Sequence, residues 1–324
     1  MTESAQLEYT TGTLPTVSVV IPNYNGRLHL DTCLASLRRL DYPQERLEII
    51  VVDNASTDES VVYLEDGYAT LVTIIKNDEN LGFAAACNQG AAAATGDYVA
   101  LLNNDMRVDR AWLRELIAPI LTARANGDAT LVCTGSQILS WDGEFIDFIE
   151  GRINLFGNGF QVDHGHRSVL SADRTEPYEI PFACGGSMLI DRAVFLDIGA
   201  FDEDFFALFE DVDLGYRIWA FGMRAVLAPK ALTYHKMHST VNTMANAKRE
   251  RLYNRNALYF CYKNLDDANV NDALLSNVLL MISMAADYIA AVGVKPADYD
   301  IRSRNELDVF VAEPTVAARI FAVQ

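Results

Sequence analysis

Short apolar runs alternate with helix-like segments through residues 17–133, and this alternation constrains the fold more than any other feature. Apolar, largely β-branched runs predict strands at 17–21, 47–52, 71–75 and 98–102, with a fifth at 130–133. Helical spacing of apolar residues lies between them, at 27–40, 60–64, 83–94 and 110–121. Such alternation is typical of βαβ units whose sheet is covered on both faces. We therefore predict an α/β fold with a Rossmann-like, mainly parallel central sheet flanked by helices.

The charge and the cysteines restrict the class of partner and the compartment. The chain has 44 acidic and 26 basic residues, and its formal net charge is −18. An acidic surface repels phosphate backbones, so we expect no nucleic-acid partner, and an anionic substrate would need a metal or a helix N-terminus. Five scattered cysteines fit reduced thiols, and residues 1–13 lack the features of a signal peptide. Both observations favour the cytoplasm.

An apolar stretch at 273–292 raises the question of membrane contact. It contains Ser276, Asn277, Ser283 and Asp287, and so falls short of a membrane span of ~20 apolar residues. We expect a buried or amphipathic helix here. Contact with a membrane surface stays open as the alternative.

Polar loops follow three of the predicted strands directly. In a parallel sheet these strand ends share one edge, where open α/β sheets bind ligands. Turn formation or helix capping would explain one such loop, but three on one edge favour a binding site. The loops contain Pro22, Asn23, Tyr24 and Asn25 after the first strand, Asp53, Asn54 and Ser56 after the second, and Asn103, Asn104 and Asp105 after the fourth.

Several of these side chains suit a nucleotide diphosphate. Asp53 could accept the imide N–H of a uracil or thymine ring, with Asn54 on the same edge, although an N-cap role is the simpler alternative. Gly82, which follows Asn80, permits a turn into an alanine-rich helix whose free N–H groups attract anions. Whether Asn88, further along that helix, faces a ligand stays open. Asp105 could ligate Mg²⁺ or Mn²⁺, which prefer few carboxylates together with phosphate oxygens.

Acidic and aromatic side chains crowd residues 202–213. Neighbouring like charges and a partly apolar pocket raise the pKa of a carboxylate, which suits a general base. Asp213 could also pair with Arg217 one helical turn later. A helix N-terminus decorated with acids is the alternative, but it does not explain the aromatic residues. The cluster consists of Asp202, Glu203, Asp204, Phe205, Phe206, Phe209, Glu210, Asp211 and Asp213.

The ordered set of motifs resembles the inverting family 2 glycosyltransferases with the GT-A fold, and most closely the bacterial rhamnosyltransferase-like branch. It covers about residues 16–264, and each motif is weak alone. The segments are VSVVIPNYNG at 17–26, VVDNASTD at 51–58, NLGF at 80–83, NND at 103–105, GGS at 185–187, FEDVDL at 209–214, and His235.

The resemblance implies a role for each matching position. Asp211 would be the catalytic base, and Glu210 would orient the acceptor or support the site. Asp105 and His235 would hold the metal, with His238 as a competitor for the second position; Asn103 stands where the family has an acid, which removes one charge from the metal site. Donor binding falls to Pro22, Asn23, Tyr24, Asn25, Asp53, Asn54, Ser56, Asn80, Gly82, Asn88, Asn103 and Asn104, and acceptor binding to Gly185, Gly186, Phe209 and Asp213.

The resemblance also implies an organisation and a function. We predict a disordered lead-in at 1–14, a catalytic domain at 15–240, and a C-terminal helical extension at 241–324; the catalytic domain divides into a nucleotide-sugar half (15–135) and an acceptor half (136–240). The expected reaction is inverting transfer from a UDP- or dTDP-sugar, such as dTDP-rhamnose, to a glycan or lipid-linked acceptor in polysaccharide synthesis. It would take place in the cytoplasm, with peripheral contact at the inner membrane face left open.

Three other functions were weighed against this one. No G-x-G-x-x-G follows the first strand, and no G-x-x-x-x-G-K-[ST] is present, which disfavours a dehydrogenase and a P-loop enzyme. A non-catalytic nucleotide-sugar or glycan-binding module, or a scaffold for polysaccharide assembly, is the remaining alternative. Asn103 gives that alternative its support, and the Glu210–Asp211 pair argues against it. Whether the chain is part of a longer protein stays open.

Overall fold

A computed structural model describes residues 14–154, 157–168, 175–236 and 246–292. Three of the sequence predictions therefore fall outside the described residues: the lead-in up to residue 13, His238, and the end of the helical extension at 293–324.

The first part of the chain forms the predicted parallel sheet. β1 pairs in parallel with β2 and β4, and β2 pairs in parallel with β3, so the spatial order is β4-β1-β2-β3. The register places Asn23 opposite Asp53 where β1 and β2 end. The elements are β1 (Val17–Asn23), α1 (Arg27–Leu37), a 3₁₀ turn (Gln44–Arg46), β2 (Leu47–Asp53), α2 (Ser60–Tyr68), β3 (Thr73–Lys76), α3 (Phe83–Ala93) and β4 (Tyr98–Leu102).

The sheet continues beyond β4 with mixed pairing. β11 lies antiparallel between β4 and β6, and β6 pairs in parallel with β12. The predicted strand at 130–133 extends to Ser140, because all ten residues of β6 are buried. The elements are β5 (Met106–Val108), α4 (Trp112–Ala125), β6 (Leu131–Ser140), β7 (Ile146–Phe148), β8 (Gly151–Ile153), β9 (Gly159–Gln161), β10 (Tyr178–Glu179), β11 (Ser187–Asp191), α5 (Arg192–Asp197), a 3₁₀ turn (Glu203–Phe205), α6 (Glu210–Ala220) and β12 (Arg224–His235).

Apolar side chains cover both faces of the sheet, as the buried strands predicted. Val19 and Ile21 of β1 point into one core cluster, together with apolar residues of α1, α2 and α4. Val20 points to the opposite face and packs with the alanines of α3 and with side chains of α5 and α6. The alternation follows from the two-residue period of a strand. At Gly90 of α3 a Cβ would lie 2.2 Å from Val20 Cγ1, so this helix sits closely against the sheet.

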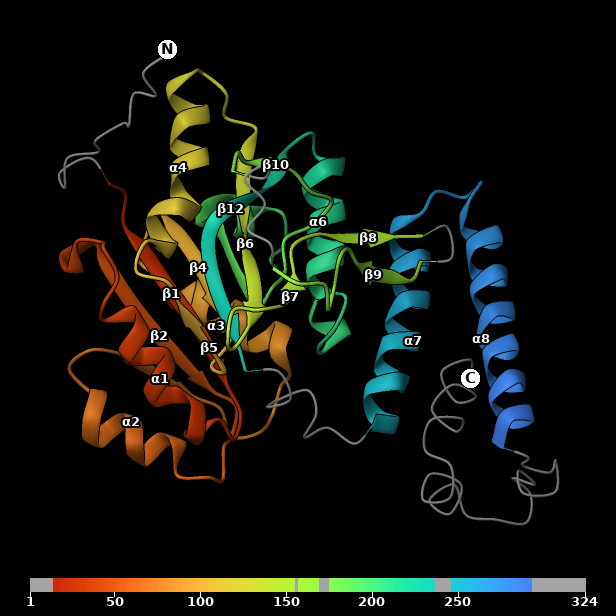
Figure 1. Cartoon of the computed structure of the whole chain (residues 1–324), viewed down its shortest axis with the longest axis horizontal. Helices are drawn as coiled ribbons and strands as arrows, with labels where there is room; N and C mark the ends of the chain where they lie inside the picture. Colours follow the sequence, from red (N-terminus) through yellow and green to blue (C-terminus); the bar gives the residue numbers. More distant parts are fainter. Residues whose placement is uncertain (1–13, 155–156, 169–174, 237–245, 293–324) are drawn as a thin grey trace.

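Two helices complete the described chain, α7 (Asn246–Asn264) and α8 (Val270–Val292), and they lie side by side at one end of the molecule (Figure 1). Ala257, Phe260 and Cys261 of α7 belong to the same core as α1 and α4. In the part of the chain that the structure describes, no helix has the length and apolar character to cross a membrane. All five cysteines are free thiols, which fits the expectation from their spacing.

Candidate active site

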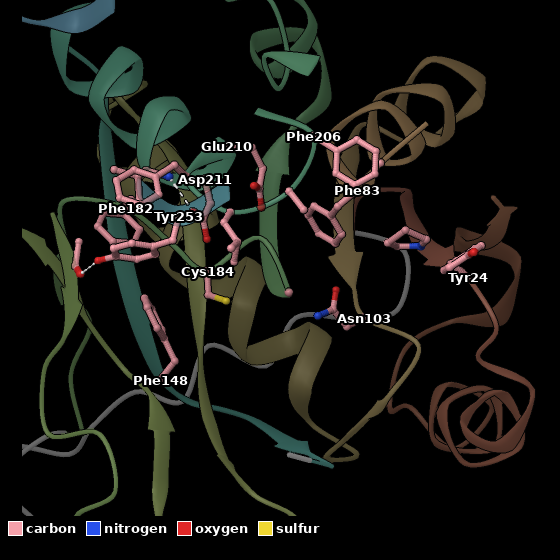
Figure 2. Close-up of a pocket in the computed structure, with 18 of the residues that line it drawn as sticks. Tyr24, Phe83, Asn103, Phe148, Phe182, Cys184, Phe206, Glu210, Asp211 and Tyr253 are labelled. Atoms are coloured by element: carbon pink, nitrogen blue, oxygen red, sulfur yellow. Dashed lines mark hydrogen bonds between the residues drawn. The ribbon is translucent and has the colours of Figure 1, made fainter. Parts of the chain in front are cut away.

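A cavity of about 840 Å³ opens where β1, β2 and β4 end and where α6 begins. Figure 2 shows Tyr24 and Asn103 on one side, Phe148, Phe182 and Tyr253 on the other, and Glu210 and Asp211 between them. We call the first side the strand-end wall (Asn23, Tyr24, Asn54, Asn103, Asn104) and the second the aromatic wall (Phe148, Phe160, Phe182, Phe209, Tyr253). Twelve of the predicted residues line this cavity: Pro22, Asn23, Tyr24, Asn54, Asn80, Gly82, Asn103, Asn104, Gly186, Phe209, Glu210 and Asp211.

Hydrogen bonds between side chains hold the strand-end wall in place. Asn23 donates from Nδ2 to Asp53 Oδ1 at 2.7 Å, and Asn104 Nδ2 donates to Asn23 Oδ1 at 2.7 Å. All three side chains are almost fully buried. At Gly26 a Cβ would lie 1.9 Å from Asn104 Nδ2 and 2.4 Å from Asn23 Oδ1, so only glycine fits beside this network. The wall is therefore formed before any ligand binds.

Four predicted donor residues do not line the cavity. Asp53 supports the wall instead, since its Oδ2 accepts the Ser56 N–H at 2.9 Å. Ser56 Oγ in turn accepts the Asn25 N–H at 2.8 Å. Asn88 joins α3 to the segment before α6 by bonding both polar backbone atoms of Phe201. Their predicted contacts with a nucleotide stay predictions.

The alanine-rich helix begins where the sequence predicted. Gly82 has φ +93°, a conformation that favours glycine. Its carbonyl oxygen accepts a hydrogen bond from Asn54 Nδ2 at 2.9 Å. A Cβ at Gly82 would lie 2.6 Å from the backbone oxygen of Phe206, so the loop before α6 approaches the start of α3 closely. The helix N-terminus thus opens at the cavity.

Gly185 and Gly186 connect Asp211 to the strand-end wall. The Gly185 N–H donates to Asp211 Oδ2 at 3.0 Å, and the Gly186 carbonyl accepts the Asn103 N–H at 2.9 Å. A Cβ at Gly186 would lie 3.0 Å from Asn103 Nδ2. One dipeptide before β11 therefore fixes the position of Asp211 relative to the end of β4.

Glu210 and Asp211 share a buried position but differ in their hydrogen bonds. Asp211 accepts N–H groups from Gly185 and Val212, and it lies in the first turn of α6, where the helix dipole favours an anion. Glu210 is 5% exposed, and among the described residues its Oε2 has no hydrogen-bond partner. Burial and the charge of Asp211 raise the pKa of Glu210 well above its ordinary value, and burial also raises the pKa of Asp211. The arrangement favours a neutral Glu210 beside an ionised Asp211.

Most of the aromatic wall was not predicted, because its side chains come from distant segments. Phe148 ends β7, Phe160 lies in β9, and Tyr253 comes from α7. Tyr253 packs edge-on against Phe209, with ring centroids 5.1 Å apart. Only the phenylalanines near Glu210 gave a local signal in the sequence.

Asp213 lies outside the cavity and is fully buried. Its Oδ2 accepts a hydrogen bond from Arg217 Nε at 2.8 Å, which confirms the ion pair predicted from the i+4 spacing. Lys263 and Asn264 of α7 also donate to Asp213, at 3.0 and 2.9 Å. In this structure its carboxylate joins α6 to α7.

Asp105 and His235 lie together, as the metal hypothesis requires. His235 Nε2 is 3.3 Å from Asp105 Oδ2, and its Nδ1 is 2.7 Å from Asp147 Oδ2. Burial alone would lower the pKa of His235, but the hydrogen bonds and charges of both carboxylates raise it to about 10. A carboxylate on the second ring nitrogen is the usual support of a metal-binding histidine. Asp147 was not predicted.

The donor set fits a divalent cation only in part. Among the described residues no group of three or more His, Cys, Asp or Glu side chains could hold a metal ion. Asp105 and His235 supply one carboxylate and one imidazole, which suits an ion that completes its shell with phosphate oxygens and water.

Sequence comparison places the chain among glycosyltransferases. The model of the family "Glycosyl transferase family 2" matches residues 18–199. An N-acetylglucosaminyl-diphospho-decaprenol L-rhamnosyltransferase of Mycobacterium tuberculosis is 28% identical over 71% of this chain and 78% of its own length. Polypeptide N-acetylgalactosaminyltransferase 10 of Mus musculus is 25% identical over 73% of this chain, and the match spans only 42% of that relative.

Solved structures share the GT-A fold. S. aureus TarS 1-349 in complex with UDP-GlcNAc superposes with a TM-score of 0.58 at 16% identity, covering 95% of this chain and 90% of that one. The mannosyltransferase PcManGT from Pyrobaculum calidifontis, in complex with GDP-Man and Mn²⁺, superposes with a TM-score of 0.56 at 18% identity. The match covers 97% of this chain and 87% of that one. The solved structures show the fold, and the family match over more than half of the sequence shows that the chain belongs to glycosyl transferase family 2.

Proposed function

We propose that this glycosyltransferase moves a sugar from a nucleotide-diphosphate donor to an acceptor hydroxyl by a single inverting displacement, with Asp211 as the general base. One observation carries the proposal. The Asp211 carboxylate is fixed by the Gly185 N–H between a strand-end wall of asparagines and a wall of aromatic rings. A base in this position could reach an acceptor on one side while a donor lies on the other.

The strand-end wall suits the nucleotide. Asn23, Asn54 and Asn104 present amide groups from buried, hydrogen-bonded positions, which limits the entropy that a ligand must remove. The two solved neighbours named above are complexes with UDP-GlcNAc and GDP-Man, which supports a nucleotide-sugar as the donor class. A UDP- or dTDP-sugar, with dTDP-rhamnose among the candidates, follows from the rhamnosyltransferase relative.

The proposed chemistry assigns separate tasks to the two acids. Asp211 accepts the proton of the acceptor hydroxyl as that oxygen attacks the anomeric carbon, and the bond to the diphosphate breaks in the same step. Its raised pKa improves it as a base. Glu210, neutral in its buried position, donates a hydrogen bond to the acceptor and keeps a second negative charge away from Asp211. The N-terminus of α3 lies near the leaving diphosphate and favours its charge.

Asp105 and His235 are the proposed ligands of a divalent cation, Mg²⁺ or Mn²⁺. The Asp147 carboxylate holds the His235 ring so that Nε2 faces Asp105. A cation bound there would neutralise the diphosphate in a chain whose net charge is −18. Asn103, which stands where the family has an acid, supplies an amide in place of a charge.

A glycan or lipid-linked acceptor fits the aromatic wall, because sugar rings bind well on aromatic faces. The relative acting on a decaprenol-linked sugar supports the lipid-linked form. Leu275, Leu279 and Ile282 are exposed on α8, which fits contact with the inner face of a membrane. A role in cell-surface polysaccharide synthesis in the cytoplasm would follow.

Release of free nucleotide tests the proposal against the binding-module alternative. UDP-GlcNAc, UDP-GalNAc, dTDP-rhamnose and GDP-mannose would each be incubated with the chain and Mn²⁺ or Mg²⁺. We expect turnover of at least one donor and its loss in excess chelator. A chain that is stabilised against heat by one of these donors, yet releases nucleotide from none of them, would be a binding module.

A further inference from the structure

The loop that precedes Glu210 has an unusual backbone. Phe206, Leu208 and Phe209 have φ values of +64°, +71° and +75°. Residues other than glycine rarely adopt positive φ, and such a backbone conformation is strained unless the surrounding structure compensates for it. Three of them occur within the 206–209 loop, directly before the two acids of the cavity. Something in the fold must hold this loop.

Asn256 of α7 supplies that support. Its side chain is fully buried, and its Nδ2 lies 3.0 Å from the carbonyl oxygen of Phe205, 2.9 Å from that of Ala207 and 2.7 Å from that of Leu208. One amide group thus donates to backbone carbonyls within and directly before the loop, among them that of Leu208, which has positive φ. Loss of these bonds would remove the Asn256 donor from the Ala207 and Leu208 carbonyls, whereas the Phe205 carbonyl would still accept the Ala207 N–H at 2.7 Å.

Neighbouring residues of α7 contact the segments on either side of the loop. Tyr259 and Lys263 donate to Asp202 at 3.0 and 2.6 Å, and Asn264 donates to Asp213 at 2.9 Å. These bonds dock the helix against both ends of the segment. Asn256, by contrast, donates to the Ala207 and Leu208 carbonyls of the loop itself.

We propose that Asn256 is a positioning residue of the transfer reaction: its amide fixes the 206–209 loop, in which three residues have positive φ, and through that loop it sets where the Glu210 and Asp211 carboxylates stand in the cavity. The reaction that it serves is the proposed function above. Helix α7 would then belong to the active site, although it lies in the segment 241–324 that was predicted to be a C-terminal extension.

Substitution of Asn256 by alanine and by serine tests the proposal, with Asn264→Ala as the matched control. Asn264→Ala removes a side-chain amide from the same helix and loses a bond to Asp213, but it leaves the loop carbonyls bonded. Hydrogen exchange of the 206–213 amides reports the loop, and UDP titration in the presence of Mn²⁺ reports the strand-end wall. Turnover is followed with whichever donor of the panel the wild-type chain uses.

We expect Asn256→Ala to speed exchange of the loop amides about tenfold or more. It should lower kcat by about 10–100-fold, since small misplacements of catalytic groups have effects of that size. UDP affinity should be unchanged. Asn256→Ser keeps one hydrogen-bond donor, so its loop exchange and its kcat should fall between those of Asn256→Ala and the wild type. The serine variant provides the test if the alanine variant does not fold. Asn264→Ala should behave as wild type in loop exchange and in kcat.

Two results would overturn the inference. Wild-type loop exchange in the Asn256 variants would show that the amide does not hold the loop. Equal losses in Asn256→Ala and Asn264→Ala would show that α7 acts only by docking as a whole. If the wild-type chain turned over no donor, the proposed function would fail, while the exchange measurement would still decide whether Asn256 fixes the loop.

Discussion

The two walls of the cavity are built in different ways. The strand-end wall follows directly from a parallel sheet: β1, β2 and β4 end at one edge, and the register places Asn23 beside Asp53. The aromatic wall and the 206–209 loop depend on contacts between segments that are far apart in the sequence, such as the bonds from Asn256 to Ala207 and Leu208. We infer that local strand order specifies the proposed donor site, whereas long-range packing specifies where the two acids proposed for catalysis, Glu210 and Asp211, stand.

This difference predicts that damage to one wall leaves the function of the other largely intact. Variants at the strand-end wall should weaken nucleotide binding, and variants at the acid pair should slow turnover without weakening binding. The predictions below separate these two effects, in order of expected size.

Asp211→Asn should produce the largest effect. Removal of a general base lowers kcat by roughly 10²–10⁴-fold, while UDP affinity should stay at the wild-type level because the strand-end wall is untouched. Steady-state kinetics and calorimetric titration of UDP with Mn²⁺ measure the two quantities. Asp204→Asn, at an exposed acid of the same segment, is the control. Near-normal turnover in Asp211→Asn would remove it as the base.

Gly26→Ala should disrupt the strand-end wall. The added Cβ would collide with Asn104 and Asn23, and overpacking of this kind destabilises a fold by about 1–3 kcal/mol. Denaturant unfolding measures the loss, and UDP affinity should fall with it. Gly67→Ala in α2 meets nothing within 4 Å and should be neutral or stabilising by up to about 1 kcal/mol. Equal effects at both glycines would contradict the proposed close packing at Gly26.

Asp105→Ala should weaken metal-dependent UDP binding by about 10–100-fold. Titration of UDP with Mn²⁺, repeated in excess chelator, measures the change. In chelator the variant and the wild type should bind UDP alike, because the strand-end wall is unchanged. A difference in UDP affinity that persists in chelator would show that Asp105 supports UDP binding by contacts that do not involve a cation.

Glu210→Gln should stabilise the fold slightly. The pKa of Glu210 is raised in the folded state, so its protonated form is favoured there, and stability is lost as pH rises above the unfolded value of about 4.3. The neutral amide avoids this loss. We expect the melting temperature to rise by about 2–4 °C at pH 8 and to change little at pH 4. A lower melting temperature at pH 8 would contradict the neutral Glu210.

The sequence predicted the strand-end wall well, because its information is local. The order of strands and helices, the loops at 22–25, 53–56 and 103–105, and the glycine start of α3 are all visible as short patterns. Parallel pairing then brings those loops together without further assumptions. The insertion of antiparallel β11 between β4 and β6 was not visible, since no local pattern records which strands become neighbours.

The aromatic wall and the acid pair beside it were predicted only in part. Glu210 and Asp211 were found from their motif, but Phe148, Phe160 and Tyr253 carry no local signal of a shared cavity. Asp147, which supports His235, lies in a stretch without regular strand or helix periodicity in the sequence. Asn256 lies in α7, where no sequence pattern sets it apart. Its role becomes visible only from its contact with the 206–209 loop. Such residues are recognised by contacts and not by spacing.

The stereochemistry of transfer tests the central claim most directly. Two neighbouring carboxylates could in principle act by double displacement, with one as a covalent nucleophile. Proton NMR of the sugar first released by hydrolysis, from the donor that the chain turns over, distinguishes the two routes. A single displacement with Asp211 as base predicts the anomer opposite to that of the donor. Release of the retained anomer would contradict the account.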